Sequence, residues 1–371
     1  MKKILHNLVI ILVIVLLKSC TYSLNIDTKL FVSGIGVDVN DEGDFSLSFS
    51  YPDISEFSPE SSKIKGDGSV CGFGKTFYEA VEDIVSKTHK TVDLEHVKVV
   101  TISSKVLNNH NNFERLLDYL SHNSQISRRV YVCASDGEAR DFINFKTKSG
   151  EHSQVFISEL IEHNSKENGI NLVTLNNLLD YFSQNKSILL PVLKLNNDKS
   201  TMYISGSYVF DNYKLVEEIN LKDTMIINFL RGDSFKILND FKYQDNNIDF
   251  EAQNIDRKIK ISDYGNVSVA LNFNLKTKIK NCLDSQHRRI NSNFINDIKN
   301  ILDKDIYNNC INLVDRFYKN GIDILNFENH IYKFNTNIWR NNINEKQEWM
   351  NKLEVRINID NNIVNIGNIS F

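Results

Sequence analysis

Strand-like and helix-like patterns alternate along the first half of the chain. Runs in which every second residue is apolar predict strands, and apolar residues that recur every three or four positions predict helices. Strands are expected at residues 31–39, 44–51, 96–102, 129–134 and 189–193, and helices at 75–85, 112–120, 136–142, 154–163 and 175–183. This alternation predicts mixed sheets with helices packed on them.

A polar stretch at residues 196–200 precedes a second half with a different pattern. Two pairs of long strands are expected, at 201–210 with 213–219 and at 248–261 with 267–279, followed by a strand at 353–359; helices are expected at 221–230 and, much longer, at 290–317. We therefore predict an α+β chain of about three domains. Residues 20–197 form a first region of two subdomains. In residues 198–371 an antiparallel sheet packs with the long helix.

The N-terminus carries a short apolar run that predicts export. Lys2 and Lys3 precede ten apolar residues, Leu8–Leu17. A helix of that length rises about 15 Å, which is half of a hydrocarbon core of about 30 Å. A basic start followed by a short apolar region and a small residue is typical of a signal peptide.

The end of this run resembles a bacterial lipobox. Leu17 stands three positions before Cys20, although Lys18 departs from the uncharged residue usual there. A thiolate is the chain's best nucleophile for forming a thioether with a lipid, and two or more acyl chains give stable anchoring. We predict a lipoprotein signal peptide at residues 1–19 and lipidation of Cys20. A plain signal peptide and an uncleaved anchor are the alternatives.

Composition and charge narrow the possible partners. The chain has 371 residues, of which 41% are apolar and 24% charged, as in ordinary globular domains with real cores. Its net charge is −4. Proteins that bind nucleic acids carry basic surfaces, so no nucleic-acid partner is expected.

No sequence motif predicts a catalytic, cofactor or metal site. Residues 72–76 read Gly-Phe-Gly-Lys-Thr, like the end of a phosphate-binding loop, but the required earlier glycine is one residue out of register, at Gly68. The nine histidines lack metal-binding spacing, and no G-x-S-x-G occurs. The Arg-Gly-Asp sequence at 231–233 is explained more simply by a helix that ends at Gly232 than by adhesion.

The other cysteines and the two tryptophans are expected to serve packing. The cysteines are Cys71, Cys133, Cys282 and Cys310. Their apolar surroundings favour buried small side chains, and their spacing predicts no disulfide framework. Trp339 and Trp349 are expected to anchor the core. A partner-facing role is the alternative, because exposed tryptophans often dominate interfaces.

The order of several segments resembles a known family. They are Gly34-Ile35-Gly36-Val37-Asp38, Phe77-Tyr78-Glu79-Ala80, residues 94–100, Leu117-Asp118-Tyr119-Leu120, Asp136-Gly137-Glu138-Ala139, residues 204–210, Asp323-Ile324-Leu325-Asn326-Phe327, Trp339 and Trp349. With the lipobox, this order is similar to the C subunits of spore nutrient-germinant receptors, the Ger(x)C lipoprotein family. Two departures are the residues after Cys20, which lack a Trp-Asp-Arg-like run, and Asn326, which stands where the family has glycine.

The resemblance implies a function without catalysis. It implies a lipoprotein on the outer face of the inner spore membrane, held there by a lipid on Cys20. It also implies assembly with a permease-like subunit and a second membrane subunit into a receptor that responds to germinants. No catalytic residue, cofactor or metal ligand is implied.

Two functions of other classes remain open. A small-solute-binding lipoprotein of a membrane transporter would need a pocket between the two halves. An exported hydrolase would need a nucleophile with its base, or a metal site, and the sequence offers neither pattern.

Overall fold

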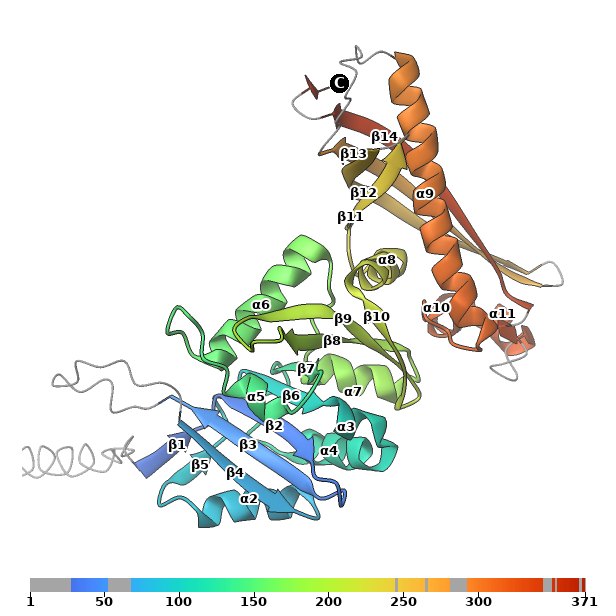
Figure 1. The fold of residues 1–371 in the computed structure, drawn as a ribbon. Coiled ribbons are helices and arrows are strands. Elements are labelled where there is room, and N and C mark those ends of the chain that lie inside the picture. Colours follow the sequence, from blue (N-terminus) through green and yellow to red (C-terminus); the bar gives the residue numbers. More distant parts are fainter. Residues whose placement is uncertain are drawn as a thin grey trace, which may run out of the picture.

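The computed structural model describes residues 28–52, 68–243, 246–263, 266–280, 292–342, 349–350, 352–366 and 369–370. In these residues it has ten helices, a sheet of eight strands, a sheet of five strands and a two-stranded pair. The eight-stranded sheet and its helices form one body, and the five-stranded sheet with one long helix forms a second (Figure 1). This is the mixed α+β architecture that the sequence predicts.

The eight-stranded sheet is mixed, with the order β10-β9-β8-β7-β6-β2-β3-β4. Its strands are β2 (Gly34–Val39), β3 (Phe45–Tyr51), β4 (Gly68–Gly74), β6 (Val99–Ser103), β7 (Tyr131–Ser135), β8 (Ile188–Leu195), β9 (Met202–Asp211) and β10 (Lys214–Asn220). β2, β6, β7 and β8 run parallel, and the strands at both edges are antiparallel. A separate parallel pair joins β1 (Lys29–Phe31) to β5 (Thr91–Asp93).

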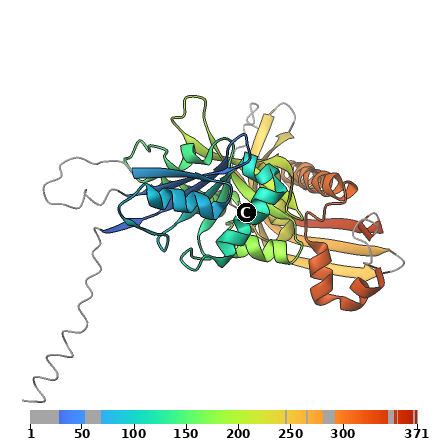
Figure 2. The ribbon, with the colours of Figure 1, turned by 90° about the horizontal axis from the view of Figure 1, so that it is seen from below.

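Helices cover both faces of this sheet. One face carries α2 (Phe77–Ser86), α3 (Ser104–Asn108), α4 (His110–His122) and α7 (Leu175–Ser183), and is turned toward the viewer in Figure 2. The other face carries α5 (Ala139–Ile143) and α6 (Ser153–Asn168). Successive residues of a strand therefore face opposite sides of the sheet: on β7, Val132 packs in the core of the first face and Cys133 in the core of the other face. Such strands are buried on both sides, which explains their near-continuous apolar sequences.

The second body is a five-stranded sheet crossed by one long helix. Its strands, in spatial order, are β11 (Lys236–Tyr243), β12 (Asn246–Asp263), β13 (Val267–Ile279), β14 (Glu354–Ile366) and β15 (Ile369–Ser370). Helix α9 (Ser292–Lys319) packs on it, and α10 (Phe327–Phe334) and α11 (Thr336–Asn342) follow. α9 covers most of the helix predicted at 290–317, and its buried residues include Ile298, Leu302, Cys310 and Phe317, whereas Ile301 is exposed.

One feature of this sheet differs from the prediction of an antiparallel sheet. β14 pairs with β13 in parallel, whereas the other pairs are antiparallel. The reason is the connection, because the chain between β13 and β14 includes α9 and crosses over before it re-enters the sheet.

The hydrogen-bonded sheet of the first body continues across the predicted boundary between residues 197 and 198. β9 pairs with β8 over residues 202–210, and β10 adds the outermost strand. Helix α8 (Leu221–Arg231) then packs under Leu189 and Val209 of this sheet and belongs to the apolar core of the second body. The two bodies therefore share one continuous core through α8.

Candidate functional site

Gly36 and Asp38 of β2 attach this strand to helix α5. The Asp38 carboxylate is buried and accepts hydrogen bonds from the backbone N–H groups of Ala139 (2.8 Å) and Arg140 (3.1 Å). The N-cap residue of α5, Glu138, makes no such side-chain bond. Asp38 thus caps a helix a hundred residues further along the chain. Burial raises the pKa of Asp38, against the opposing effect of these two donors.

Gly36 permits this close approach. A Cβ built on Gly36 would lie 3.2 Å from the backbone carbon of Ala139 and 3.2 Å from Ile143 Cδ1. Contacts this short force the neighbour to move, so a side chain at this position would displace α5 by a few tenths of an ångström. The Gly-x-Asp spacing is therefore a helix-docking device, and it explains why these residue types stand together in the sequence.

A second buried aspartate caps α10 in the same way. Asp323 accepts hydrogen bonds from the N–H groups of Phe327 (3.0 Å) and Glu328 (2.7 Å), and the Tyr318 hydroxyl donates to it. Burial raises the pKa of Tyr318 well above its usual value, and the neighbouring Asp323 charge adds to this. Asp323 and its three donors fix the position at which α10 leaves the end of α9.

Asn326 joins the two bodies directly. Its backbone has φ +57°, in the left-handed region, which glycine adopts freely and asparagine tolerates better than most residues. Its side chain accepts a hydrogen bond from the Ser187 N–H (2.8 Å) and donates one to the Ser187 carbonyl oxygen (3.2 Å). Glycine could supply the backbone conformation here, but not these two bonds.

Arg231 completes this junction. Its Nε donates to the Ile324 carbonyl (2.7 Å) and its Nη2 to the Ser187 carbonyl (3.0 Å). Gly232 ends α8 in the left-handed conformation, with φ +85°. The prediction that this glycine is a helix end is confirmed, and the arginine beside it serves the contact between the bodies.

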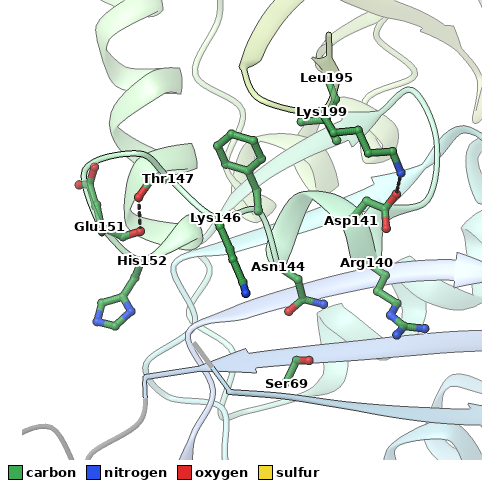
Figure 3. A pocket seen from close by; sticks show the side chains of 12 residues that line it. Ser69, Arg140, Asp141, Asn144, Lys146, Thr147, Glu151, His152, Leu195 and Lys199 are labelled. Atoms are coloured by element: carbon green, nitrogen blue, oxygen red, sulfur yellow. Dashed lines mark hydrogen bonds and ion pairs between the residues drawn. The ribbon is translucent and has the colours of Figure 1, made fainter. Parts of the chain in front are cut away.

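One hollow of the first body lies beside α5 (Figure 3). It measures ≈ 650 Å³ and is walled by α5, the segment at 144–152, Ser69 of β4, Leu195 of β8 and Lys199. Lys199 Nζ forms an ion pair with Asp141 (2.6 Å), and the Thr147 hydroxyl donates to the Glu151 carbonyl (2.6 Å). The hollow therefore carries both positive and negative side chains, and the ion pair between Lys199 and Asp141 neutralises part of its charge.

The phosphate-loop-like segment forms a packed strand and helix start. β4 includes both glycines of this segment and leads into α2. Thr76 accepts from the Glu79 N–H (3.0 Å), and the Glu79 carboxylate accepts from the Lys75 N–H (2.9 Å). These residues occupy the donors that would otherwise face a phosphate. A Cβ on Gly72 would collide with the Ala80 carbonyl oxygen, so this glycine serves the packing of α2.

The thiols in the described residues are structural. Cys133 and Cys310 are buried, as predicted, and burial raises the pKa of each to about 12. They are therefore protonated and poorly nucleophilic at neutral pH. Cys71 is half-buried, and Cys282 lies outside the described residues. In the described part of the chain, no three His, Cys, Asp or Glu side chains gather as metal ligands would.

The two tryptophans have different surroundings. Trp349 is 2% exposed and belongs to the core of the second body, as predicted. Trp339 on α11 is half-buried and meets the Tyr332 ring edge-on, at 5.0 Å between centroids. It packs against this core from outside, beside the exposed ring of Tyr332.

The predicted lipidation residue, Cys20, lies outside the described residues. Within them, every helix is too short or too polar to cross a bilayer.

Comparison with known families assigns the chain. A model described as "Spore germination protein N-terminal domain" matches residues 23–195, and one described as "Spore germination B3/GerAC like, C-terminal" matches residues 205–367. The chain belongs to the GerAC family of spore germination proteins. The family resemblance seen in the sequence is thus confirmed. The two GerAC models meet near the predicted boundary at 197, although β9 and β10 pair with the sheet before it.

Individual relatives agree with this assignment. Spore germination protein A3 of Bacillus subtilis (strain 168) is 24% identical over 248 residues, which cover 66% of this chain and 65% of that protein. The chain thus aligns with slightly less than two thirds of this relative's length. The crystal structure of the GerBC protein has a TM-score of 0.59 and 16% identity, over 89% of this chain and 97% of that one. The GerAC fold is therefore shared with GerBC.

Proposed function

We propose that this protein is the lipid-anchored C subunit of a spore nutrient-germinant receptor, and that it acts by docking to membrane partner subunits. The observation that carries the proposal is the match of both GerAC domains in order, behind a lipobox-like sequence that ends at Cys20. The partners would be a permease-like subunit and a second membrane subunit. The protein would lie on the outer face of the inner spore membrane.

A lipid tether suits docking for a physical reason. Each buried CH₂ of an acyl chain contributes about 0.8 kcal/mol, so two chains hold a protein firmly at the bilayer. Cys20 lies eight positions before Thr28, where the described structure begins, and a fully extended chain over eight positions spans at most about 30 Å. Confinement to this layer raises the effective concentration of a membrane partner, so modest contact surfaces suffice.

The chemistry of the described residues also favours docking over catalysis. The buried thiols are protonated. The buried aspartates Asp38 and Asp323 hold backbone N–H groups at helix starts. These four groups therefore serve the packing and capping of the interior.

The experiment compares Cys20→Ala with Cys71→Ala in spores. Cys20→Ala should remove the protein from the spore membrane fraction and slow germination, while the folded body persists. Cys71→Ala is the matched control, because it removes a half-buried thiol elsewhere and should leave both readouts unchanged. Wild-type membrane level and germination rate in Cys20→Ala spores would refute the role of the tether.

A further inference from the structure

A cavity of ≈ 310 Å³ lies where the two bodies meet. Its wall comes from the end of α7 and the turn after it, the end of α8, β12 and α10. Most of its ionisable side chains are basic: Lys186, Arg231, Arg257, His330 and Lys333, with Asp233 as the carboxylate of the wall. The chain as a whole has a net charge of −4, so this concentration of positive charge is local.

Within the described residues, none of the four lysine and arginine side chains of this cavity forms an ion pair. The Arg231 and Arg257 guanidinium groups donate to backbone carbonyls, the latter to Leu230 O at 2.7 and 3.1 Å. Lys186 Nζ lies 5.4 Å from the centre of the Tyr181 ring, and Lys333 Nζ donates to a glutamine oxygen at 3.2 Å. These partners are neutral, and the carboxylates of Asp233 in the wall and Asp180 beside it offset the four charges only in part.

This arrangement is electrostatically costly without a ligand. Burial lowers the pKa of Lys186, and the nearby Lys333 charge lowers it further. Burial and the Arg257 charge together lower the pKa of His330. In addition, Arg231 Nη1 is buried without a hydrogen-bond partner in the described part of the protein, and an unsatisfied buried donor of this kind commonly marks an ion or water that completes the site.

The hollow beside α5 provides a comparison. There, Lys199 forms an ion pair with Asp141 at 2.6 Å, so lysine and carboxylate neutralise each other. In the cavity between the bodies the cations outnumber the carboxylate by four to one. The difference indicates that the second cavity is complementary to an external anion.

We propose that this cavity binds a small soluble oxyanion, a phosphate or a compact polycarboxylate, with two or three negative charges. Four cations less one carboxylate leave a charge of three to neutralise, and the volume is at the low end of the range for ligand pockets. Lys186 belongs to the first body, and Arg257 and Lys333 to the second. The bound anion would therefore hold the two bodies in one arrangement. This inference is independent of lipid anchoring and docking.

The test uses the full chain purified in detergent, with thermal unfolding and titration calorimetry. The probes are inorganic phosphate and citrate, each compared with chloride at equal ionic strength. Wild type should show a higher unfolding temperature with phosphate or citrate than with chloride. Lys186→Gln/Lys333→Gln should weaken binding about a hundredfold, taking about tenfold for each lost charge-assisted contact. Lys146→Gln/Lys199→Gln, which removes two lysines from the hollow beside α5, should bind as wild type does.

Folding of the double variant is checked without the anion. Its unfolding temperature should equal or exceed that of wild type, because two repelling charges are gone. Lys333→Gln alone alters an exposed side chain and should weaken binding about tenfold. The proposal is overturned if neither probe raises the unfolding temperature of wild type above its value in chloride, or if both double variants lose binding equally. It is also overturned if phosphatidylglycerol vesicles, added in place of the soluble probes, are alone in raising the unfolding temperature.

Discussion

Asn326 carries the most informative substitution in the junction between the two bodies. It combines a left-handed backbone, with φ +57°, and two side-chain hydrogen bonds to the backbone of Ser187. Asn326→Gly removes the two bonds but accepts the backbone conformation. Asn326→Ala removes the bonds and adds strain, because a Cβ disfavours this region. The pair separates the two contributions.

The magnitudes follow from these contacts. Each hydrogen bond contributes about 0.5–1.5 kcal/mol net. We expect Asn326→Gly to lower the free energy of unfolding by about 1–2 kcal/mol, after partial relief of backbone strain. Asn326→Ala should lower it by about 2–4 kcal/mol, since alanine at positive φ costs about 1 kcal/mol more than glycine.

The assay is urea unfolding followed by tryptophan fluorescence. Both tryptophans, Trp339 and Trp349, belong to the second body, so their signal reports this body, while circular dichroism reports both. Asn329→Ala is the matched control on α10. Its side chain also reaches the first body, with a long 3.4 Å bond to Gln184, and its loss should cost less than about 0.5 kcal/mol. Equal losses for the alanine and glycine variants of Asn326 would refute the role of the left-handed conformation.

Two further predictions concern the attachment of α5 to β2. Burial raises the pKa of Asp38 in the folded state above its value in the unfolded chain, near 3.8. Protonation of Asp38 therefore stabilises the fold at pH values below the unfolded pKa. This contribution is lost as the pH rises through the folded pKa. The stability of wild type relative to Asp38→Asn should therefore decline from pH 3 to pH 7 in urea unfolding, and a constant difference would contradict the burial argument. Gly36→Ala should lower the free energy of unfolding by about 1–3 kcal/mol in the same assay, because the new methyl meets Ala139 and Ile143 at 3.2 Å. Unchanged stability would show that α5 does not lie so close.

Much of the fold follows from local pattern. The alternation of β13 is strict, and its inward residues from Val267 to Ile279 are buried as the period of two requires. α7 matches its predicted range because a capping box at Thr174 marks its start. The spacing of apolar residues every three or four positions likewise predicts the long helix α9. These elements are stabilised by packing on a single, regular apolar face.

Other elements depend on contacts that no local pattern reveals. β4 contains three glycines, and two of them, Gly72 and Gly74, allow α2 to lie close to the strand. The parallel entry of β14 depends on the crossover through α9. The boundary near residue 197 marks a change in pattern, yet the sheet continues through β9 and β10, since hydrogen bonding between strands is not visible in composition.

The same limit applies to the sites. Asp38 and the helix that it caps are a hundred residues apart, and the cations of the interbody cavity come from four separate segments between residues 186 and 333. Only the fold brings them together. The prediction that Cys20 is lipidated rests, in contrast, on the residues beside it, because a lipobox is a local signal.

The most direct test of the proposed function is the mass of the N-terminal peptide of this protein extracted from spore membranes. The account predicts a peptide that begins at Cys20 and carries a thioether-linked diacylglyceryl group. A peptide with an unmodified Cys20, or one that retains residues 1–19, would contradict it.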